Sequence, residues 1–415
     1  MNTEKNVDVL VIGAGPSGTI AASLIKQAGY DVAIVEKMKF PRFVIGESLL
    51  PRCMEALEEA KFLDAVKAKN FQQKDGAKFL MHDGKICDFN FDQQYTNGWK
   101  WTWQVPRAEF DKTLADECEK MGIPIFYETE VTGIVIHDDH SITTVKTKDG
   151  ATETIRAKFI VDGSGYGRVI PRLFNLDKPS NQAPRKAVFC HMSDPKRMEN
   201  YEPNRIIAYI HDEKTWIWVI PFSNGNTSLG FVSDPEFFDQ YKGDVTEQYK
   251  QLIQSMPYLK ERFGEAELQW EEPRFLQSWS STTDKFFGKG FVLTGNVTEF
   301  LDPIFSSGVT LASVSAQTAA KLVIKHLRGE KVDWENDYMN PMKKGVDVFR
   351  TYVNAWYEGL LFKIFFSENP DEKIMSQICS VLAGYVWDET NPFVKNHEKN
   401  VRTLARFLDA QKQTV

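Results

Sequence analysis

Cysteine is scarce in this chain, and long apolar runs are missing. The 415 residues include five cysteines, and no two of them stand close enough for a C-x-x-C metal or redox pair. Sparse thiols are typical of a reducing compartment, so we expect a cytoplasmic protein without a disulfide scaffold. No apolar run approaches the roughly 18 residues of a membrane span, and the first residues lack the pattern of a signal peptide. The sequence therefore predicts no transmembrane segment.

The chain also lacks an excess of positive charge. The 50 lysines and arginines against 57 aspartates and glutamates give a net charge of −7. This balance argues against a nucleic-acid partner, because phosphates are bound by a basic face. The H-E-x-x-H, G-x-S-x-G and P-loop motifs are absent, so zinc protease, serine hydrolase and kinase chemistry have no support. His137 and His140 flank two aspartates, but a polar hairpin turn explains them better than a metal site, and we expect no metal.

The most informative motif is a glycine-rich turn between a strand and a helix. The apolar run Val7–Ile12 predicts a buried parallel strand. Three glycines follow it with G-x-G-x-x-G spacing, namely Gly13, Gly15 and Gly18. Glycines there let the backbone approach a pyrophosphate, and the helix N-terminus favours the negative charge. Glu36 closes a second predicted strand, where an acid would accept hydrogen bonds from ribose hydroxyls. The unit predicts a dinucleotide site, for either FAD or NAD(P).

The rest of the chain shows three kinds of pattern. Buried strands at Phe159–Val161 and Phe291–Leu293 each lead into a glycine turn, and strand-like alternation fills 78–103 and 187–232. Beyond Gly329 the chain is helical, and its aromatic residues suit core packing better than a substrate wall. We predict an α/β fold with three parts. These are a discontinuous, Rossmann-like (three-layer ββα) dinucleotide-binding domain of residues 1–77, 104–185 and 281–328, a β-sheet substrate domain of residues 78–103 and 186–280, and a C-terminal helical region of residues 329–415.

Five further segments narrow the interpretation. They are KFPRFVIGESLLP (Lys39–Pro51), WQVPRAEFDKTL (Trp103–Leu114), FIVDGSG (Phe159–Gly165), TWIWVIP (Thr215–Pro221) and TGNVTEFLDPIFSSGV (Thr294–Val309). Together with the glycine turn, these segments resemble the flavin-dependent halogenases over roughly residues 5–365. The wider relatives are the single-component FAD monooxygenases and the geranylgeranyl reductases. The resemblance implies an FAD-dependent oxidoreductase, with FAD at the glycine turn.

The resemblance also implies which residues hold FAD. They are Gly13, Gly15, Ser17, Gly18, Glu36, Lys37, Arg42, Glu47, Ser48, Arg107, Val131, Asp162, Gly163, Gly295, Asn296, Pro303, Ser307, Gly308 and Val309. One position departs from the family, which usually has Gly-Asp where this chain has Gly295-Asn296. Asparagine keeps an acceptor oxygen and loses the charge. The change predicts weaker FAD binding, as would suit an enzyme that takes up diffusible reduced flavin.

Four residues are the catalytic candidates. Trp216 and Trp218 complete the family's W-x-W-x-I-P signature, which is thought to keep substrate away from the flavin, although two tryptophans are also common in an ordinary sheet core. Lys74 matches the lysine that halogenases place between flavin and substrate, although most lysines are simply solvated. Ser306 belongs to a turn that enters a helix and offers backbone N–H groups to an anion such as halide. Other flavoproteins share part of that turn.

The combined hypothesis is a two-component halogenase. It would use reduced FAD, O₂ and a halide (chloride or bromide) to halogenate an electron-rich aromatic ring, phenolic or pyrrolic, free or tethered to a carrier protein. A second G-x-G-x-x-G is absent, so a separate flavin reductase is expected to supply the electrons. Two alternatives stay open. One is an FAD monooxygenase or a geranylgeranyl-reductase-like flavoprotein, and the other is a flavin-binding protein without catalysis.

Overall fold

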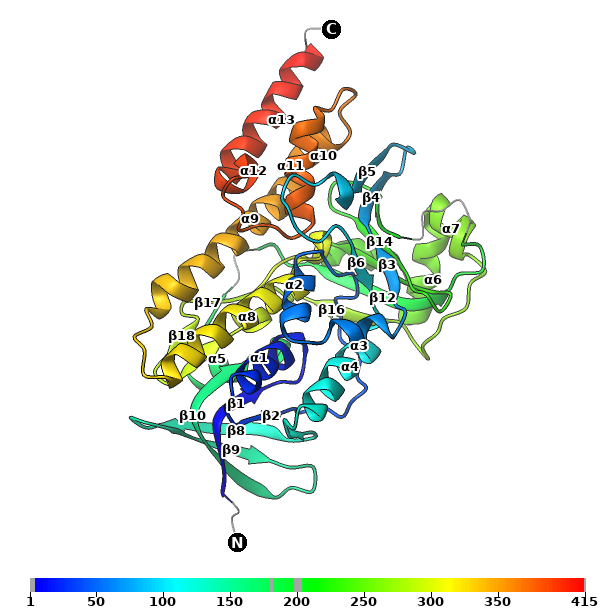
Figure 1. The fold of residues 1–415 in the computed structure, drawn as a ribbon. Helices are drawn as coiled ribbons and strands as arrows, with labels where there is room; N and C mark the ends of the chain where they lie inside the picture. The colour runs from blue at the N-terminus through cyan, green and yellow to red at the C-terminus, as the bar shows by residue number, and fades with distance from the viewer. Residues whose placement is uncertain (1–3, 180–181, 198–203, 414–415) are drawn as a thin grey trace.

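The computed structural model describes residues 4–179, 182–197 and 204–413. A mostly parallel sheet with helices on one face forms one part of the molecule, and a second sheet and the C-terminal helices form the rest (Figure 1). The architecture confirms the predicted α/β class. No helix among these residues is long and apolar enough to cross a membrane, and all five cysteines are buried and unpaired.

The first sheet carries the predicted glycine turns. Its strands, in the order of their main path, are β18 (Phe287–Gly288), β19 (Phe291–Leu293), β10 (Thr152–Asp162), β1 (Glu4–Ile12), β2 (Val32–Val35) and β7 (Ile125–Phe126). The strands β19, β10, β1, β2 and β7 are parallel neighbours. Parallel strands all end at the same edge, so the turns that follow β1, β2, β10 and β19 meet there.

The side chains of β1 alternate between the two faces of the parallel sheet and pack in a different apolar layer on each face. Val9 and Val11 pack in one apolar cluster with the helices, while Leu10 and Ile12 pack in another beneath the hairpin of β8 (Glu130–Ile136) and β9 (Ser141–Lys146). The helices of the first cluster include α1 (Pro16–Gln27), α2 (Cys53–Glu59), α3 (Leu63–Lys67), α4 (Arg107–Lys120) and α8 (Ser307–Leu327). The short α5 (Val169–Leu173) packs with the hairpin in the second cluster. The predicted His137–His140 turn joins β8 to β9, and no cluster of metal-ligating side chains occurs among the described residues.

The second sheet is antiparallel except for one pair. Its order is β16 (Arg274–Gln277), β12 (Lys186–Ser193), β15 (Asn226–Ser233), β14 (Trp216–Pro221), β13 (Arg205–Ile210), β4 (Gly76–Met81) and β5 (Ile86–Asn90), with β13 and β4 parallel. One face packs on α6 (Val245–Ser255) and α7 (Pro257–Phe263). The other face packs on the C-terminal helices, so β13 and β14 are buried throughout.

Two small sheets complete the strand pairings. The strands β3 (Gln72–Lys74) and β6 (Thr102–Gln104) pair with each other in a separate ladder, and β11 (Asp177–Lys178), β17 (Ser281–Thr283) and β20 (Glu299–Phe300) form another. The strand β4 starts at residue 76, two residues before the predicted change of domain. The division into three domains stays a prediction.

The C-terminal region is helical, as predicted. A π-helical turn at Trp334–Met339 leads into α9 (Asn340–Tyr357), α10 (Leu360–Phe365), α11 (Glu372–Leu382), α12 (Pro392–Lys395) and α13 (His397–Gln413). The aromatic side chains of α9 and α10, including Phe349, Trp356 and Phe365, lie in the same buried cluster as Phe79 and Phe305. They therefore serve as core packing. Figure 1 shows these helices covering the β4–β5 end of the second sheet.

One glycine in α9 lets the chain after α11 pack closely. A Cβ atom at Gly345 would lie 2.4 Å from the indole of Trp387, whose Nε1 donates to the carbonyl oxygen of Pro341 at 2.9 Å. We expect Gly345→Ala to lower the free energy of unfolding by about 1–2 kcal/mol, because overpacking outweighs the gain in helix propensity. Urea denaturation measures it, with the exposed Asn354→Ala on the same helix as a control. A more stable Gly345→Ala protein would contradict this packing argument.

Candidate active site

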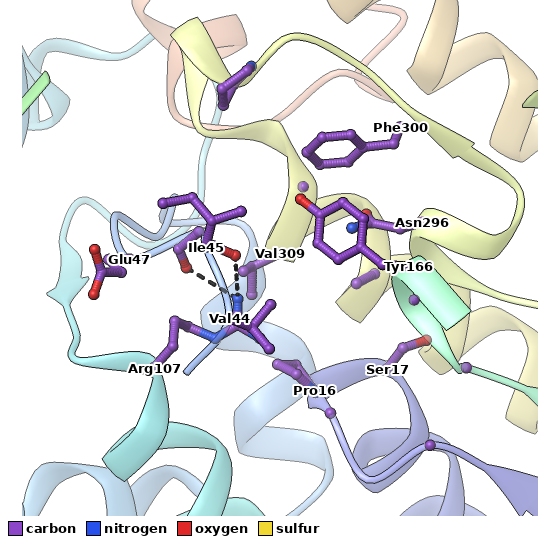
Figure 2. Close-up of a pocket in the computed structure, with 18 of the residues that line it drawn as sticks. Pro16, Ser17, Val44, Ile45, Glu47, Arg107, Tyr166, Asn296, Phe300 and Val309 are labelled. Carbon is purple, nitrogen blue, oxygen red and sulfur yellow. Dashed lines mark hydrogen bonds between the residues drawn. The ribbon is translucent and has the colours of Figure 1, made fainter. Parts of the chain in front are cut away.

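A cavity of about 350 Å³ opens where the turns of the parallel sheet face the second sheet (Figure 2). Gly13 follows β1, Glu36 follows β2, Gly163 follows β10 and Thr294 follows β19, and all four line the cavity. The opposite wall comes from β14 and from the segment that enters α8. The cavity therefore occupies the place where open α/β sheets bind ligands, at the carboxyl ends of their strands.

Two helices point uncapped N-termini into this cavity. The N-cap residues are Gly15 for α1 and Ser306 for α8, and among the described residues no side chain caps either helix. The N–H groups of a first helical turn need partners and carry partial positive charge, so each end suits an anion. A Cβ at Gly18 would lie 1.8 Å from the carbonyl oxygen of Gly13, so only glycine permits this tight entry into α1. The end of α1 fits a pyrophosphate.

A buried carboxylate fixes the loop beside α1. Asp111 on α4 has no exposed surface and accepts hydrogen bonds from Arg42 at 2.6 Å and from Arg107 at 2.8 and 3.0 Å. The Nη1 of Arg107 also donates to the carbonyl oxygens of Ile45 and Gly46, at 3.0 and 3.2 Å (Figure 2). Two guanidinium groups share this one carboxylate, so Asp111 does not neutralise both of them, and a guanidinium beside the cavity suits an anionic ligand.

The acid at the end of β2 is ordered by the backbone. The carboxylate of Glu36 accepts the N–H groups of Ala14 at 2.9 Å and Met38 at 2.8 Å. It is buried and lines the cavity next to the glycine turn. A carboxylate held in this way can also accept hydrogen bonds from ribose hydroxyls. The glycine turn, the uncapped helix and this acid together fit a dinucleotide.

Most of the residues proposed for FAD line this one cavity. They are Gly13, Gly15, Ser17, Glu36, Lys37, Arg42, Glu47, Ser48, Arg107, Gly163, Asn296, Pro303, Gly308 and Val309. The cavity lining does not include the other five, which are Gly18, Val131, Asp162, Gly295 and Ser307. Several of these shape the turns instead. Asp162 accepts the N–H groups of Ser164 and Ile170 at 3.0 and 2.7 Å, and burial raises its pKa.

Val131 lies away from the cavity, on β8. It pairs with Val145 and packs against the cluster beneath the sheet. Gly295 donates its N–H to Ser315 on α8 at 2.8 Å. Both residues support the layers around the cavity without lining it.

The two tryptophans of the signature form part of the second-sheet wall. Trp216 and Trp218 lie two residues apart on β14, so both side chains face the cavity. Trp218 Nε1 donates to Ser228 Oγ at 3.0 Å, and its indole lies over Gly230, where a Cβ would come within 2.1 Å. Trp216 Nε1 donates to the hydroxyl of Tyr357 on α9 at 3.0 Å. Each indole is thus fixed by packing and by a hydrogen bond.

Lys74 lies beside the large cavity, not in it. Its side chain lines a second cavity of about 20 Å³, which shares Ser306 and Ile206 with the first. The lysine is 1 % exposed, and its Nζ donates to the carbonyl oxygen of Leu49 at 2.8 Å. Burial lowers its pKa from 10.5 to about 7. A substantial fraction of this amine is therefore neutral near pH 7, and Ser306 and Ile206 lie between its small cavity and the large one.

Sequence reasoning missed several residues at the site. Tyr166 and Phe300 line the cavity with ring centroids 5.2 Å apart, and Figure 2 shows them together on one side of it. The flanking glycines at 165 and 167, directly after a predicted buried strand, were a usable signal for Tyr166. His191 is a second omission. Its Nε2 lies 2.6 Å from Oε1 of Glu47, whose Oε2 is buried without a partner among the described residues.

Lys74 should make stability depend on pH. Because the folded protein disfavours the ammonium, the unfolded chain binds more protons between about pH 7 and pH 10.5. The cost of burying the Lys74 ammonium destabilises the folded protein in full below its folded-state pKa of about 7. This cost disappears as pH rises toward 10.5, the pKa of the lysine in the unfolded chain. We expect Lys74→Met to be more stable than the wild type near pH 7, with the difference shrinking by about 2 kcal/mol from pH 7.5 to pH 9.

Urea denaturation at the two pH values measures this difference. The exposed Lys69→Met variant is the control, and its difference from the wild type should stay constant. A Lys74→Met difference that is equally constant would show that the amine is charged at both pH values.

The comparisons with known proteins agree with this geometry. A family model described as an FAD binding domain matches residues 6–338. Among curated proteins, the 1H-pyrrole-2-carbonyl peptidyl-carrier-protein chlorinase of Pseudomonas fluorescens is 26% identical over 416 residues, which cover 93% of this chain and 90% of the relative. Flavin-dependent halogenase armH5 of Armillaria mellea is 26% identical over 358 residues, which cover 81% of this chain and 68% of the relative.

A solved structure is more similar in sequence. The crystal structure of a flavoprotein/dehydrogenase from Cytophaga hutchinsonii is 54% identical, with a TM-score of 0.96, over 98% of this chain and 100% of that chain. The glycine turn, the two uncapped helices and Glu36 fit the FAD that the family model describes. The chain belongs to the FAD binding domain family, as an FAD-dependent oxidoreductase that resembles the flavin-dependent halogenases.

Proposed function

We propose that the protein is a two-component halogenase that uses reduced FAD, O₂ and a halide to halogenate an electron-rich aromatic ring. The observation that carries the proposal is the placement of Lys74. It is a buried lysine whose pKa is lowered to about 7. The small cavity that it lines has Ser306 and Ile206 in common with the FAD cavity. A solvated lysine would have no such environment. Burial of an amine without a carboxylate partner is typical of a lysine that works in its neutral form.

FAD would be held by the α1 end of the cavity. When bound and reduced, it would supply two electrons to O₂, and the halide would supply two more, so that the products are hypohalous acid and water. The N–H groups at the start of α8, around Ser306, Ser307 and Gly308, offer a halide site on the same cavity. Trp216 and Trp218 line the cavity from β14, where their indoles would separate an aromatic substrate from the flavin. Substrate would then meet the halogen on the Lys74 side.

The neutral amine of Lys74 can carry the halogen. Its lone pair takes the halogen from hypohalous acid, and the amine proton leaves with the hydroxide as water. An electron-rich ring then attacks the halogen, loses its own proton, and returns the amine to its starting form. The hydrogen bond from Nζ to the Leu49 carbonyl holds the amine in place for both steps.

One relative suggests the substrate class that we propose. The Pseudomonas fluorescens chlorinase is named for a pyrrole carbonyl group on a peptidyl carrier protein, so we propose a pyrrolic or phenolic ring that a carrier protein can deliver. A separate flavin reductase would provide the reduced FAD.

The first test is a product screen by mass spectrometry. The protein is mixed with FAD, NADH, a flavin reductase, O₂ and bromide over a panel of phenols, pyrroles and carrier-tethered pyrroles. We expect a bromine isotope doublet that Lys69→Met retains and Lys74→Met reduces at least about 100-fold, the scale of a lost catalytic group. Equal bromination by both variants would remove Lys74 from the mechanism. A product heavier by one oxygen, with or without bromide, would make the protein a monooxygenase.

A second test concerns Asn296, which lines the cavity beside the start of α8. An aspartate there would add a negative charge at a helix N-terminus and accept stronger hydrogen bonds from the hydroxyls of bound FAD. We expect Asn296→Asp to lower the Kd of FAD by about threefold to tenfold, as measured by quenching of flavin fluorescence. Asn224→Asp, in the exposed turn after β14, is the control for added charge. A Kd that rises in Asn296→Asp would show that the family's aspartate does not suit this cavity.

A further inference from the structure

Tyr357 joins two parts of the wall opposite the glycine turn, although it does not itself line the cavity. It is the last residue of α9, and its hydroxyl accepts the N–H of Trp216 at 3.0 Å. The same hydroxyl donates to Oδ2 of Asp302, also at 3.0 Å. The guanidinium carbon of Arg185 lies 3.8 Å from the centroid of the tyrosine ring and holds it from one side. None of the sequence motifs includes Tyr357.

The two partners of this hydroxyl each fix a part of the cavity. Trp216 contributes its indole to the second-sheet wall. Asp302 accepts the N–H of Ile304 at 3.1 Å and thereby caps the short 3₁₀ turn Pro303–Phe305. That turn ends at Ser306, which has a left-handed backbone (φ 55°) and begins α8. Pro303 and Ser306 both line the cavity, so a shift of Asp302 would move the start of α8.

The chemistry of the three groups makes the hydroxyl hard to replace. An indole N–H can only donate and a carboxylate can only accept, whereas a phenol does both at once. Trp216 is 2 % exposed and Asp302 is 3 % exposed, so water has little access to either. Loss of the hydroxyl would leave two buried polar groups each short of one hydrogen bond, and the protein would relieve this by moving them.

We propose that Tyr357 is a positioning residue for FAD. Its hydroxyl fixes Trp216 and the turn at Asp302 relative to each other in one wall of the cavity, so helix α9 of the C-terminal region sets the shape of the cofactor site. The inference rests on FAD binding and not on halogenation, so a failure of the proposed reaction would leave it standing.

The test is a double-mutant cycle read out by the Kd of FAD. Tyr357→Phe keeps the ring and removes the hydroxyl, and we expect the Kd to rise about fivefold to twentyfold. Trp216→Phe removes the N–H that the hydroxyl accepts. Because the two changes break the same contact, the double variant should raise the Kd by clearly less than the product of the single effects. The visible absorption band of bound FAD, which responds to its surroundings, should shift in Tyr357→Phe.

A matched control separates positioning from general stability. Tyr249 on α6 is fully buried and donates to the carbonyl oxygen of Leu229 at 2.8 Å, on the face of the sheet away from the C-terminal helices. Tyr249→Phe should lower the melting temperature of the apoprotein as much as Tyr357→Phe does, with an unchanged Kd of FAD. An unchanged Kd in Tyr357→Phe, or effects that multiply in the double variant, would overturn the proposal.

A second cycle covers the case in which Tyr357→Phe does not fold. Asp302→Asn puts an amide NH₂ where the carboxylate oxygen accepted the hydroxyl proton. The structure links Asp302 to Trp216 through Tyr357, so Asp302→Asn and Trp216→Phe should be coupled in their effect on FAD affinity. Strictly multiplicative effects would show that the hydroxyl does not couple Trp216 to the turn at Asp302.

Discussion

The carboxylate of Asp111 is the point on which the FAD site depends. A charge without exposed surface is costly unless it is paired, and here Arg42 and Arg107 pair with it. Arg107 extends the same interaction to the carbonyl groups of the loop before Glu47. That loop continues to Leu49, whose carbonyl oxygen holds the amine of Lys74. A single buried charge on α4 therefore organises both the cofactor cavity and the lysine behind it.

Local sequence patterns predicted the parts of the site that local structure determines. The glycine turn, Glu36 and the strands that lead into the other turns are encoded by short stretches, because a parallel strand must end at the common edge where ligands bind. The tryptophans on β14 could likewise be placed on one face from their spacing of two. Gly13, Gly15, Glu36 and both tryptophans line the cavity.

Contacts between distant segments could not be read in the same way. Asp111 was visible only as an ordinary helix residue, and His191 and Tyr357 reach the site from strands and helices whose packing is set by the whole fold. Lys74 was identified as a candidate, but the sequence did not show that it occupies a separate small cavity. Five of the proposed FAD residues do not line the cavity. Gly18 and Asp162 shape turns instead, because a motif includes every residue that a turn needs and not only those that touch a ligand.

The size of the small cavity beside Lys74 has a consequence for substrate selection. At about 20 Å³ it has room for roughly one water molecule, whereas an aromatic ring needs several times that space. Phe79, Phe305 and Leu382 occupy the surrounding volume. A ring can approach the amine only after these side chains repack, so substrate preference would depend on how readily this apolar cluster deforms as well as on matching polar contacts.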